Sequence, residues 1–269
     1  MQKTAKYVIW TVAISSSLML GACASTTNEN TLGGNRKQFI MLPEQQYHAQ
    51  AAQDYGSLIQ QVRASGQLKS NAQVTRVSQR LLQQVPIYRA DAAQWNWQVN
   101  VIESKDINAF AMPGGKIAVF TGLLNAVKPT DDELAAVLAH EIAHALREHS
   151  REKASKSAVG GLVTSLITSY AGLSNTGNEV VSLASKYGWD LPNSRSAETE
   201  ADLIGLEMMA RAGYNPNAAI TFWQKMAAAN LQSGQSVSFL STHPASADRI
   251  AKIQQTIPQV MPYYQAAKR

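Results

Sequence analysis

The sequence predicts a predominantly helical α+β domain with a small antiparallel sheet beside one central helix. Most of the 269 residues fall in segments with spaced apolar side chains, separated by glycine or proline. Residues 95–120 instead contain short β-prone runs around a Pro-Gly-Gly turn. About 230 residues follow the N-terminal region, which is enough for one domain with a substantial core.

The first 22 residues have the features of a bacterial export signal. Two lysines precede an apolar stretch over residues 7–20, which at about 14 residues is shorter than the roughly 20 needed to span a bilayer. Residues 20–23 read LGAC, which matches a lipobox, and Cys23 is the only cysteine. We therefore expect a signal peptide at 1–22 and an acylated Cys23 as the mature N-terminus.

The residues after Cys23 predict a tether and a location. Ala24 stands where an aspartate would be a retention signal, so resemblance to known lipoproteins indicates a lipid anchor in the Gram-negative outer membrane, facing the periplasm. Residues 23–38 are rich in Ser, Thr, Asn and Gly and predict a flexible tether, with the domain at 39–269. The net charge is +5 without a basic stripe interleaved with aromatics, so nucleic acid is not an expected partner.

Helices and a hairpin are expected in a definite order. Residues 44–84 predict two helices separated near Gly66, and residues 95–102 alternate as a strand does. Residues 108–112 and 116–120 flank Pro-Gly-Gly and predict a hairpin whose turn needs positive φ. A short helix should follow from about residue 121.

The central helix begins at Thr130, which with Glu133 forms a capping box, and it should run to about Arg151. Residues 158–172 are apolar but rich in Gly, Ser and Thr, which fits either a buried helix or a mobile flap near the active site. Three further helices are expected: one from Ser194 to before Gly213, one at 218–231 and one at 245–256.

The central helix carries a His-Glu-x-x-His motif. His140 and His144 are four residues apart, so they project from the same helix face and could bind one tetrahedral Zn²⁺ per chain. Glu141 lies beside that face and could accept the proton of a water at the metal. The alternative is a chance match on a solvated helix. His149 should lie about 140° around the helix from His144, so we expect it to be a solvated surface residue.

A catalytic zinc ion needs a third protein ligand, and the best candidates lie at residues 194–202. Glu198 and Asp202 are four residues apart and share a helix face, whereas Glu200 is about 200° away and should point elsewhere. One carboxylate can bind zinc while the other accepts the N–H of a ligating histidine. We assign Glu198 as the ligand and Asp202 as the partner of His140 or His144. The alternative is a solvated, acidic helix start.

These motifs together resemble the HtpX, Oma and BepA family of zinc peptidases. The resemblance rests on Asn-Ala-Phe-Ala-x-Pro-Gly-Gly at 108–115, His-Glu-x-x-His at 140–144 and Ser-Arg-x-x-Glu-x-x-Ala-Asp at 194–202, and it covers roughly residues 40–255. It implies a zincin-like (gluzincin) fold with zinc held by two histidines and one glutamate. With the lipobox, the chain resembles a lipid-anchored outer-membrane member of that family.

The resemblance also implies roles for two C-terminal residues and one strand. In similar proteins a histidine matching His243 can approach the zinc, so His243 is a candidate fourth ligand that would displace water and hold the enzyme latent. Its alternative is a loop or helix-cap residue. Arg249 could stabilise an oxyanion or support the site. Residues 108–112 would form an edge strand that pairs with substrate, using Asn108, Ala109 and Phe110, unless they only pack beneath the helix.

The expected function is therefore zinc-dependent hydrolysis of peptide bonds, with Glu141 as general base. The expected substrates are unfolded or misassembled envelope proteins, and the other candidate partners are the membrane, through the N-terminal lipid, and a partner protease or assembly machinery. A rival hypothesis is an outer-membrane chaperone or assembly factor that contains zinc but does not cleave, with His243 capping the metal. A third is a tethered structural lipoprotein with a fortuitous motif.

Overall fold

A computed structural model describes residues 23–160, 193–233 and 238–268. Its helices are α2 (Glu44–Ala64), α3 (Ala72–Leu82), α4 (Val85–Tyr88), α5 (Thr121–Val127), α6 (Asp131–Leu146), α7 (His149–Gly160), α9 (Arg195–Arg211), α10 (Ala218–Ser233), α11 (Ser238–Thr242) and α12 (Ala247–Ala267), with a 3-10 turn at Asp91–Gln94. Its strands are β1 (Cys23–Ala24), β2 (Gln38–Phe39), β3 (Leu68–Lys69), β4 (Gln98–Ile102), β5 (Ala109–Met112) and β6 (Lys116–Phe120). This confirms the predicted helical α+β class.

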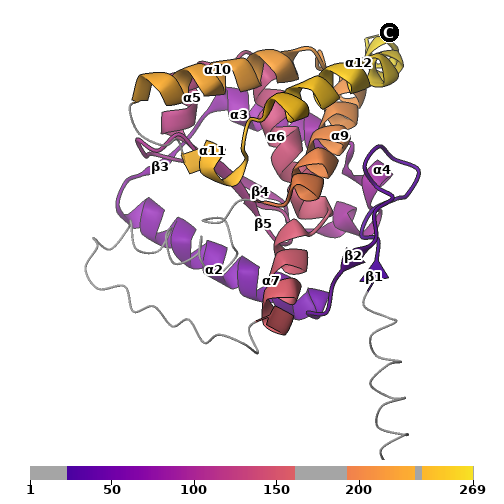
Figure 1. The fold of residues 1–269 in the computed structure, drawn as a ribbon. Coiled ribbons are helices and arrows are strands. Elements are labelled where there is room, and N and C mark those ends of the chain that lie inside the picture. The colour runs from indigo at the N-terminus through magenta and orange to yellow at the C-terminus, as the bar shows by residue number, and fades with distance from the viewer. Residues whose placement is uncertain (1–22, 161–192, 234–237, 269) are drawn as a thin grey trace, which may run out of the picture.

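Helix α6 lies in the middle of the fold (Figure 1). On one side α6 packs against strand β5 and helix α3, and on the other side against α9 and α10. Helix α12 packs along α9, so the C-terminal helices form an outer layer, while α2 runs along the opposite side of the molecule. Any side chain on α6 that faces α9 is therefore shielded from water by two layers of helix.

The four-stranded sheet has the order β3-β4-β6-β5 and is mixed rather than purely antiparallel. The predicted hairpin is present: β5 and β6 are antiparallel, and Gly114 and Gly115 have φ values of 72° and 79°. The chain places β5 at the edge and returns to pair β6 with β4, and β4 and β6 are then parallel. A side chain at Gly115 would lie 2.6 Å from the Trp97 ring, so the turn needs glycine there.

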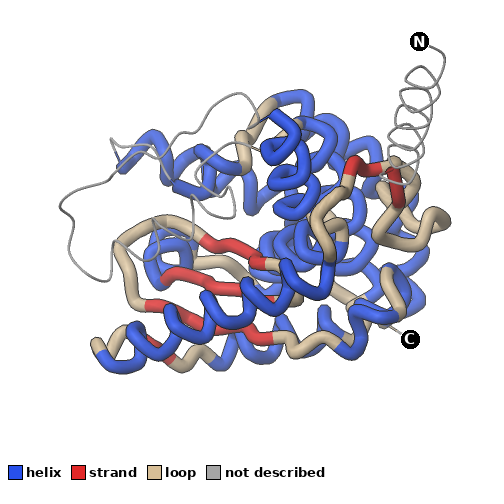
Figure 2. The backbone as a smooth tube through the Cα atoms, turned by 90° about the horizontal axis from the view of Figure 1, so that it is seen from below, coloured by secondary structure: helices blue, strands red, loops and turns tan. Residues whose placement is uncertain are grey.

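Both faces of the sheet are buried. Phe110, Met112 and Phe120 pack toward Tyr55 and other side chains of α2. The residues between them in the strands face α3 and α6, and all five residues of β6 are buried. Figure 2 shows the strands with α2 lying along one face. A strand covered on both faces does not alternate between apolar and polar residues.

Helix α6 starts as predicted, since both hydrogen bonds of the Thr130–Glu133 capping box are present. Every side chain from 133 to 146 is buried. The prediction that the helix continues to Arg151 is wrong: α6 ends at Leu146, and α7 begins at His149 after a break at Glu148.

The break is held by buried charges. Glu148 has φ of 49°, a left-handed conformation that costs free energy for a residue with a side chain. Its carboxylate is fully buried and lies 2.8 Å from His48 Nε2, 3.1 Å from Arg89 Nη1 and 3.2 Å from Arg151 Nη2. Glu44 joins the same group through both arginines. Because two guanidinium groups neutralise its carboxylates, this cluster is a structural ion-pair network rather than a metal site.

The N-terminal segment differs from the flexible tether predicted for residues 23–38. Residues 24–39, which we call the N-terminal clasp, pack on the domain, and strand β2 near their end pairs with β1 at their start. Gln38 is fully buried and donates to the Arg147 carbonyl (2.6 Å) and to Glu152 (2.9 Å). Arg36 forms ion pairs with Glu152 and Glu200. The composition of this segment predicted a linker. Its charged partners, Glu152 and Glu200, lie more than 100 residues away along the chain, so the local sequence does not reveal them.

The remaining elements mostly follow the sequence. Helix α9 is capped by Ser194 and stops before Gly213 at φ 75°. Helix α12 continues through Pro258 and Pro262 to Ala267, beyond the predicted end near residue 256. Of residues 158–172, those from 161 onward lie outside the described residues. Among the described helices none has the length and hydropathy of a membrane span.

We expect acid to weaken the attachment of the N-terminal clasp. Burial raises the pKa of Glu152, but hydrogen bonds from Arg36, Lys156 and Gln38 outweigh it and lower this pKa to about 2, below the ordinary value of 4.5. The stabilisation is therefore complete above pH 4.5 and is lost as pH falls toward 2. Glu152→Gln should lower the free energy of unfolding at pH 7 by about 3 kcal/mol and flatten its pH dependence between those limits, measured by urea denaturation.

Glu103→Gln is the matched control, because Glu103 pairs with Lys69 while more than half exposed. Its effect should stay within about 1 kcal/mol. Equal losses for the two variants would contradict a stabilising role for Glu152.

Candidate metal centre and active site

Four side chains that the sequence singled out converge beside α6. His140 and His144 come from α6, Glu198 from the first turn of α9, and His243 from the residue after α11. One ligand atom from each lies within 4.8 Å of the others, and all four residues are buried. The histidine Nε2 atoms are 3.0 Å apart, and Glu198 oxygens lie 3.3 Å from His144 Nε2 and 3.5 Å from His140 Nε2.

Asp202 contacts His140 as the sequence predicts. Its Oδ1 atom lies 3.0 Å from His140 Nδ1, so the carboxylate can accept the Nδ1–H and leave the Nε2 lone pair facing the cluster. Burial and the Arg249 charge lower the pKa of His140, but Asp202 and Glu198 outweigh them and raise it to about 9. The surroundings of this ring therefore favour a positive charge.

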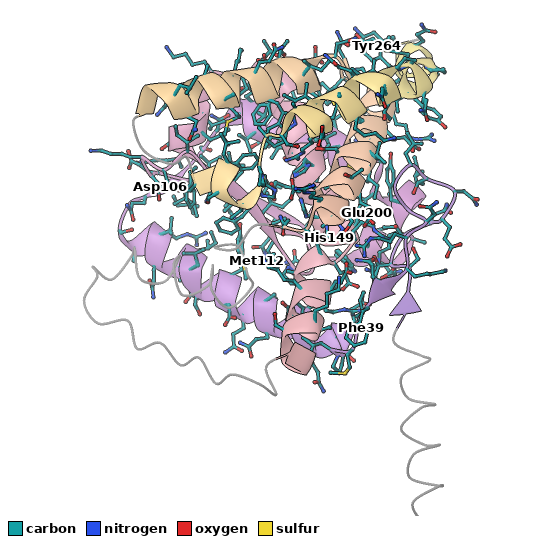
Figure 3. All side chains as sticks on the ribbon, viewed as in Figure 1. Phe39, Asp106, Met112, His149, Glu200 and Tyr264 are labelled. Atoms are coloured by element: carbon teal, nitrogen blue, oxygen red, sulfur yellow. The ribbon has the colours of Figure 1, made fainter. Side chains whose placement is uncertain are left out.

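His144 is contacted by His149, and here the sequence prediction is wrong. His149 is buried rather than solvated, with its Nδ1 2.8 Å from His144 Nδ1 and its Nε2 3.1 Å from Glu200 Oε2. The angular argument assumed an unbroken helix, whereas the left-handed residue Glu148 turns the chain and brings His149 back to the site. Figure 3 shows His149 and Glu200 next to one another between α7 and α9.

The chemistry of the donor set fits a divalent cation. The Nε2 atoms of His140 and His144 lie 3.0 Å apart in a buried place, with Glu198 oxygens within 3.5 Å of both, so three atoms of the kind that bind a cation converge on one point. When ionised, Glu141, Glu198 and Asp202 leave two negative charges after Arg249 is counted. Imidazole nitrogens and a carboxylate oxygen are the ligands that zinc takes in catalytic sites. The residues therefore fit one Zn²⁺.

Glu141 lies beside this cluster with an unsatisfied oxygen. The side chain is 2% exposed, and its Oε1 has no hydrogen-bond partner among the described residues. His243 Nε2 lies 3.5 Å from this oxygen. The pKa of Glu141 is raised above its ordinary value, because the effect of burial is larger than the opposing effect of His243 and His140. A buried carboxylate with a free oxygen can accept a proton from a water molecule.

Arg249 supports the ligands from the side away from the cleft. Its Nη1 lies 2.6 Å from Glu198 Oε2, its Nε and Nη2 bind Asp202, and its guanidinium lies 3.9 Å from the Trp223 ring centroid. These contacts engage the guanidinium fully. Of the two roles considered for Arg249, the geometry favours support of the site over stabilisation of an oxyanion.

His243 lies close enough to the other ligands to be a fourth. Its Nδ1 is 2.9 Å from Glu198 Oε1 and 3.2 Å from His140 Nε2. Asn193, which the sequence reasoning missed, donates to the same Glu198 oxygen at 2.9 Å. Asn193 stands just before the motif at 194–202, and only its position in a helix-start loop could have suggested it.

A cleft runs between the metal-site residues and the hairpin. Residues 108–113 line one wall, and Glu141, His144, Asn193 and His243 line the other parts. Strand β5 is an edge strand, as predicted, with no strand on its outer side in the described part of the chain. The Phe110 ring, however, is buried 5.9 Å from the Phe120 ring in the core beneath the strand. Asn108 and the backbone of Ala109 thus remain the candidates for substrate contact, while the buried side chains of Ala109 and Phe110 mainly pack.

This fold and this donor set are those of a gluzincin-type zinc peptidase domain, with two histidines and a glutamate around one metal position. The chain belongs to peptidase family M48, whose family model matches residues 68–257.

Individual relatives support the assignment. The mitochondrial metalloendopeptidase OMA1 of Schizosaccharomyces pombe is 39% identical over 163 residues, covering 61% of this chain and 47% of the relative. Metalloprotease LoiP of Escherichia coli is 30% identical over 156 residues, covering 57% and 60%. The beta-barrel assembly-enhancing protease of Yersinia pestis is 28% identical over 224 residues, covering 78% and 44%. The aligned part of this chain spans about half the length of these relatives.

Zinc should stabilise the protein because it binds the folded donor set. At a free zinc concentration a thousandfold above Kd, the gain is about 4 kcal/mol, which should appear as a higher Tm by calorimetry. Chelation should reverse the shift, and Glu198→Gln should remove most of it. Glu103→Gln, outside the site, should keep it. An equal shift in Glu198→Gln would contradict the ligand assignment.

Proposed function

We propose that the protein is a zinc-dependent endopeptidase that cleaves unfolded or misassembled envelope proteins. The observation that carries this proposal is the cleft in which the unpaired Glu141 oxygen, the metal-site histidines and the edge strand β5 face one another. Membership of family M48 and relatives named metalloendopeptidases support the activity.

The substrate class follows from the shape of the site. A peptide that pairs with the open edge of β5 must be extended, because it contributes backbone N–H and C=O groups in strand geometry. A folded protein rarely offers such a segment, whereas an unfolded or misassembled one does. The cleft is therefore suited to peptide segments that have lost, or not yet gained, their tertiary structure.

The residues of the chain have distinct roles in the proposed hydrolysis. When bound, zinc supplies a Lewis acid that polarises the scissile carbonyl and makes water more acidic. Glu141 accepts a proton from the attacking water and then donates it to the leaving amine. Asp202 holds His140 and Arg249 holds Glu198, so the ligands need not reorganise during the reaction.

For location, we propose a signal peptide at 1–22 and a lipid on Cys23 that anchors the protein in the outer membrane, facing the periplasm. The lipobox and Ala24 support this. The name of the relative from Yersinia pestis refers to beta-barrel assembly, which favours misassembled envelope proteins as substrates and assembly machinery or another protease as a partner. Other relatives are named for mitochondria.

An alternative function is a zinc-containing chaperone or assembly factor that is latent or does not cleave. The observation that favours it is His243, whose Nδ1 lies 2.9 Å from Glu198 and 3.2 Å from His140. As a fourth ligand His243 would occupy the position that the attacking water needs. Closure by His243 would then set whether the site cleaves or only binds a substrate.

Glu141→Gln separates metal binding from catalysis. The amide keeps the size of the side chain but cannot accept a proton, so casein cleavage should fall by about 10² to 10⁴. Zinc content, measured by atomic emission, should stay at one ion per chain, and Asp248→Asn, an exposed change, should leave cleavage unaffected. Cleavage by Glu141→Gln at the wild-type rate would refute the assignment.

His243→Ala tests latency. If His243 blocks the water position, this variant should cleave casein several-fold faster than the wild type, and a chelator should abolish the gain. The same assay distinguishes the two functions. Chelator-sensitive cleavage supports the peptidase, whereas cleavage by neither protein, with zinc bound to both, supports the chaperone.

A further inference from the structure

A chain of contacts leads from His144 to the N-terminal clasp. His144 Nδ1 lies 2.8 Å from His149 Nδ1, and His149 Nε2 lies 3.1 Å from Glu200 Oε2. Arg147 Nε donates to the same Glu200 oxygen at 3.0 Å, and Arg36 of the clasp binds both Glu200 oxygens. Within the described residues, both nitrogens of His149 are thus engaged while the ring is only 5% exposed.

The hydrogen positions along this series of contacts follow by elimination. Glu200 is an ionised acceptor because two guanidinium groups contact it, so His149 Nε2 must carry a hydrogen and donate it. In the neutral ring, His149 Nδ1 then has a lone pair and accepts the hydrogen on His144 Nδ1. The remaining nitrogen, His144 Nε2, is left with its lone pair directed at His140 and Glu198.

We propose that His149 and Glu200 are positioning residues of the metal site, which fix His144 in the tautomer whose Nε2 binds the metal, and that Arg36 of the N-terminal clasp helps to hold Glu200 in place. The proposal rests on the zinc site of the proposed function but not on proteolysis. It makes the two ligating histidines unequal. His140 is oriented by a carboxylate directly, and His144 by a carboxylate acting through a second imidazole.

Under this proposal, the break at Glu148 and the docking of the clasp both support the metal site. The left-handed break at Glu148 places His149 against His144, and the clasp supplies a guanidinium group that contacts both oxygens of Glu200. Because Arg36 of the clasp contacts Glu200, and Glu200 supports His144 through His149, metal binding and docking of the clasp should stabilise each other. Loss of either should weaken the other, as linkage requires.

Two substitutions at one position test the relay. His149→Leu fills the space but has no polar atoms, whereas His149→Gln can accept from His144 through its carbonyl and donate to Glu200 through its NH₂ group. The readouts are the zinc dissociation constant, from competition with a chromophoric chelator, and the visible absorption of the Co²⁺-substituted protein. We expect His149→Leu to weaken zinc binding by about 10- to 100-fold and to alter the Co²⁺ spectrum. His149→Gln should bind within about threefold of the wild type.

Two further variants separate the relay from stability and test the clasp. Val77→Ala, on the buried face of α3 and outside both the clasp and the relay, should lower stability yet keep the zinc Kd. Arg36→Met should weaken zinc binding several-fold, and by less than His149→Leu, because Arg147 still holds Glu200.

The zinc dissociation constants of these variants test the relay and the role of the clasp separately. An unchanged Kd in His149→Leu, or equal weakening in the Leu and Gln variants, would overturn the relay. An unchanged Kd in Arg36→Met would overturn the part assigned to the clasp. In all three cases the proposed peptidase function would stand, whereas failure of the wild type to bind zinc would overturn that function as well.

Discussion

Two imidazole Nε2 atoms that converge to 3.0 Å in a buried place, beside a glutamate, set the main constraint on this structure. For both nitrogens to bind one metal ion, each must present a lone pair, so each ring must be held from behind in one tautomer. Asp202 holds one ring, and His149 with Glu200 holds the other. Both carboxylates, Glu200 and Asp202, come from α9, where they are two residues apart. The packing of α9 along α6 brings them to the two histidines.

The end of α6 is as important as its motif. The motif alone would place His149 on the far side of the helix, and the buried Glu148 carboxylate changes that by stabilising a left-handed residue. Two of its partners, His48 of α2 and Arg89, come from distant parts of the chain, and the third, Arg151, lies one turn further along α7. A buried ion-pair network that is costly by itself thus has a structural role, because it turns the chain where the metal site needs another histidine.

The N-terminal clasp and the edge strand border the same site from different sides. The clasp binds behind the metal residues, through Arg36, and the cleft opens in front of them, along β5. A domain held near a membrane through residue 23 would therefore carry its anchor on the segment that touches the supports of the metal site.

The sequence by itself determined the local features. The spacing of His140 and His144, the pair Glu198 and Asp202, the capping box at Thr130 and the hairpin glycines all act within a few residues, so they could be predicted and the structure contains them. Only the tertiary structure decided the parallel pairing of β4 with β6, the break at Glu148, the place of His149 and the docking of the clasp. Each depends on charges or strands brought together from far along the chain, and no local periodicity records such contacts.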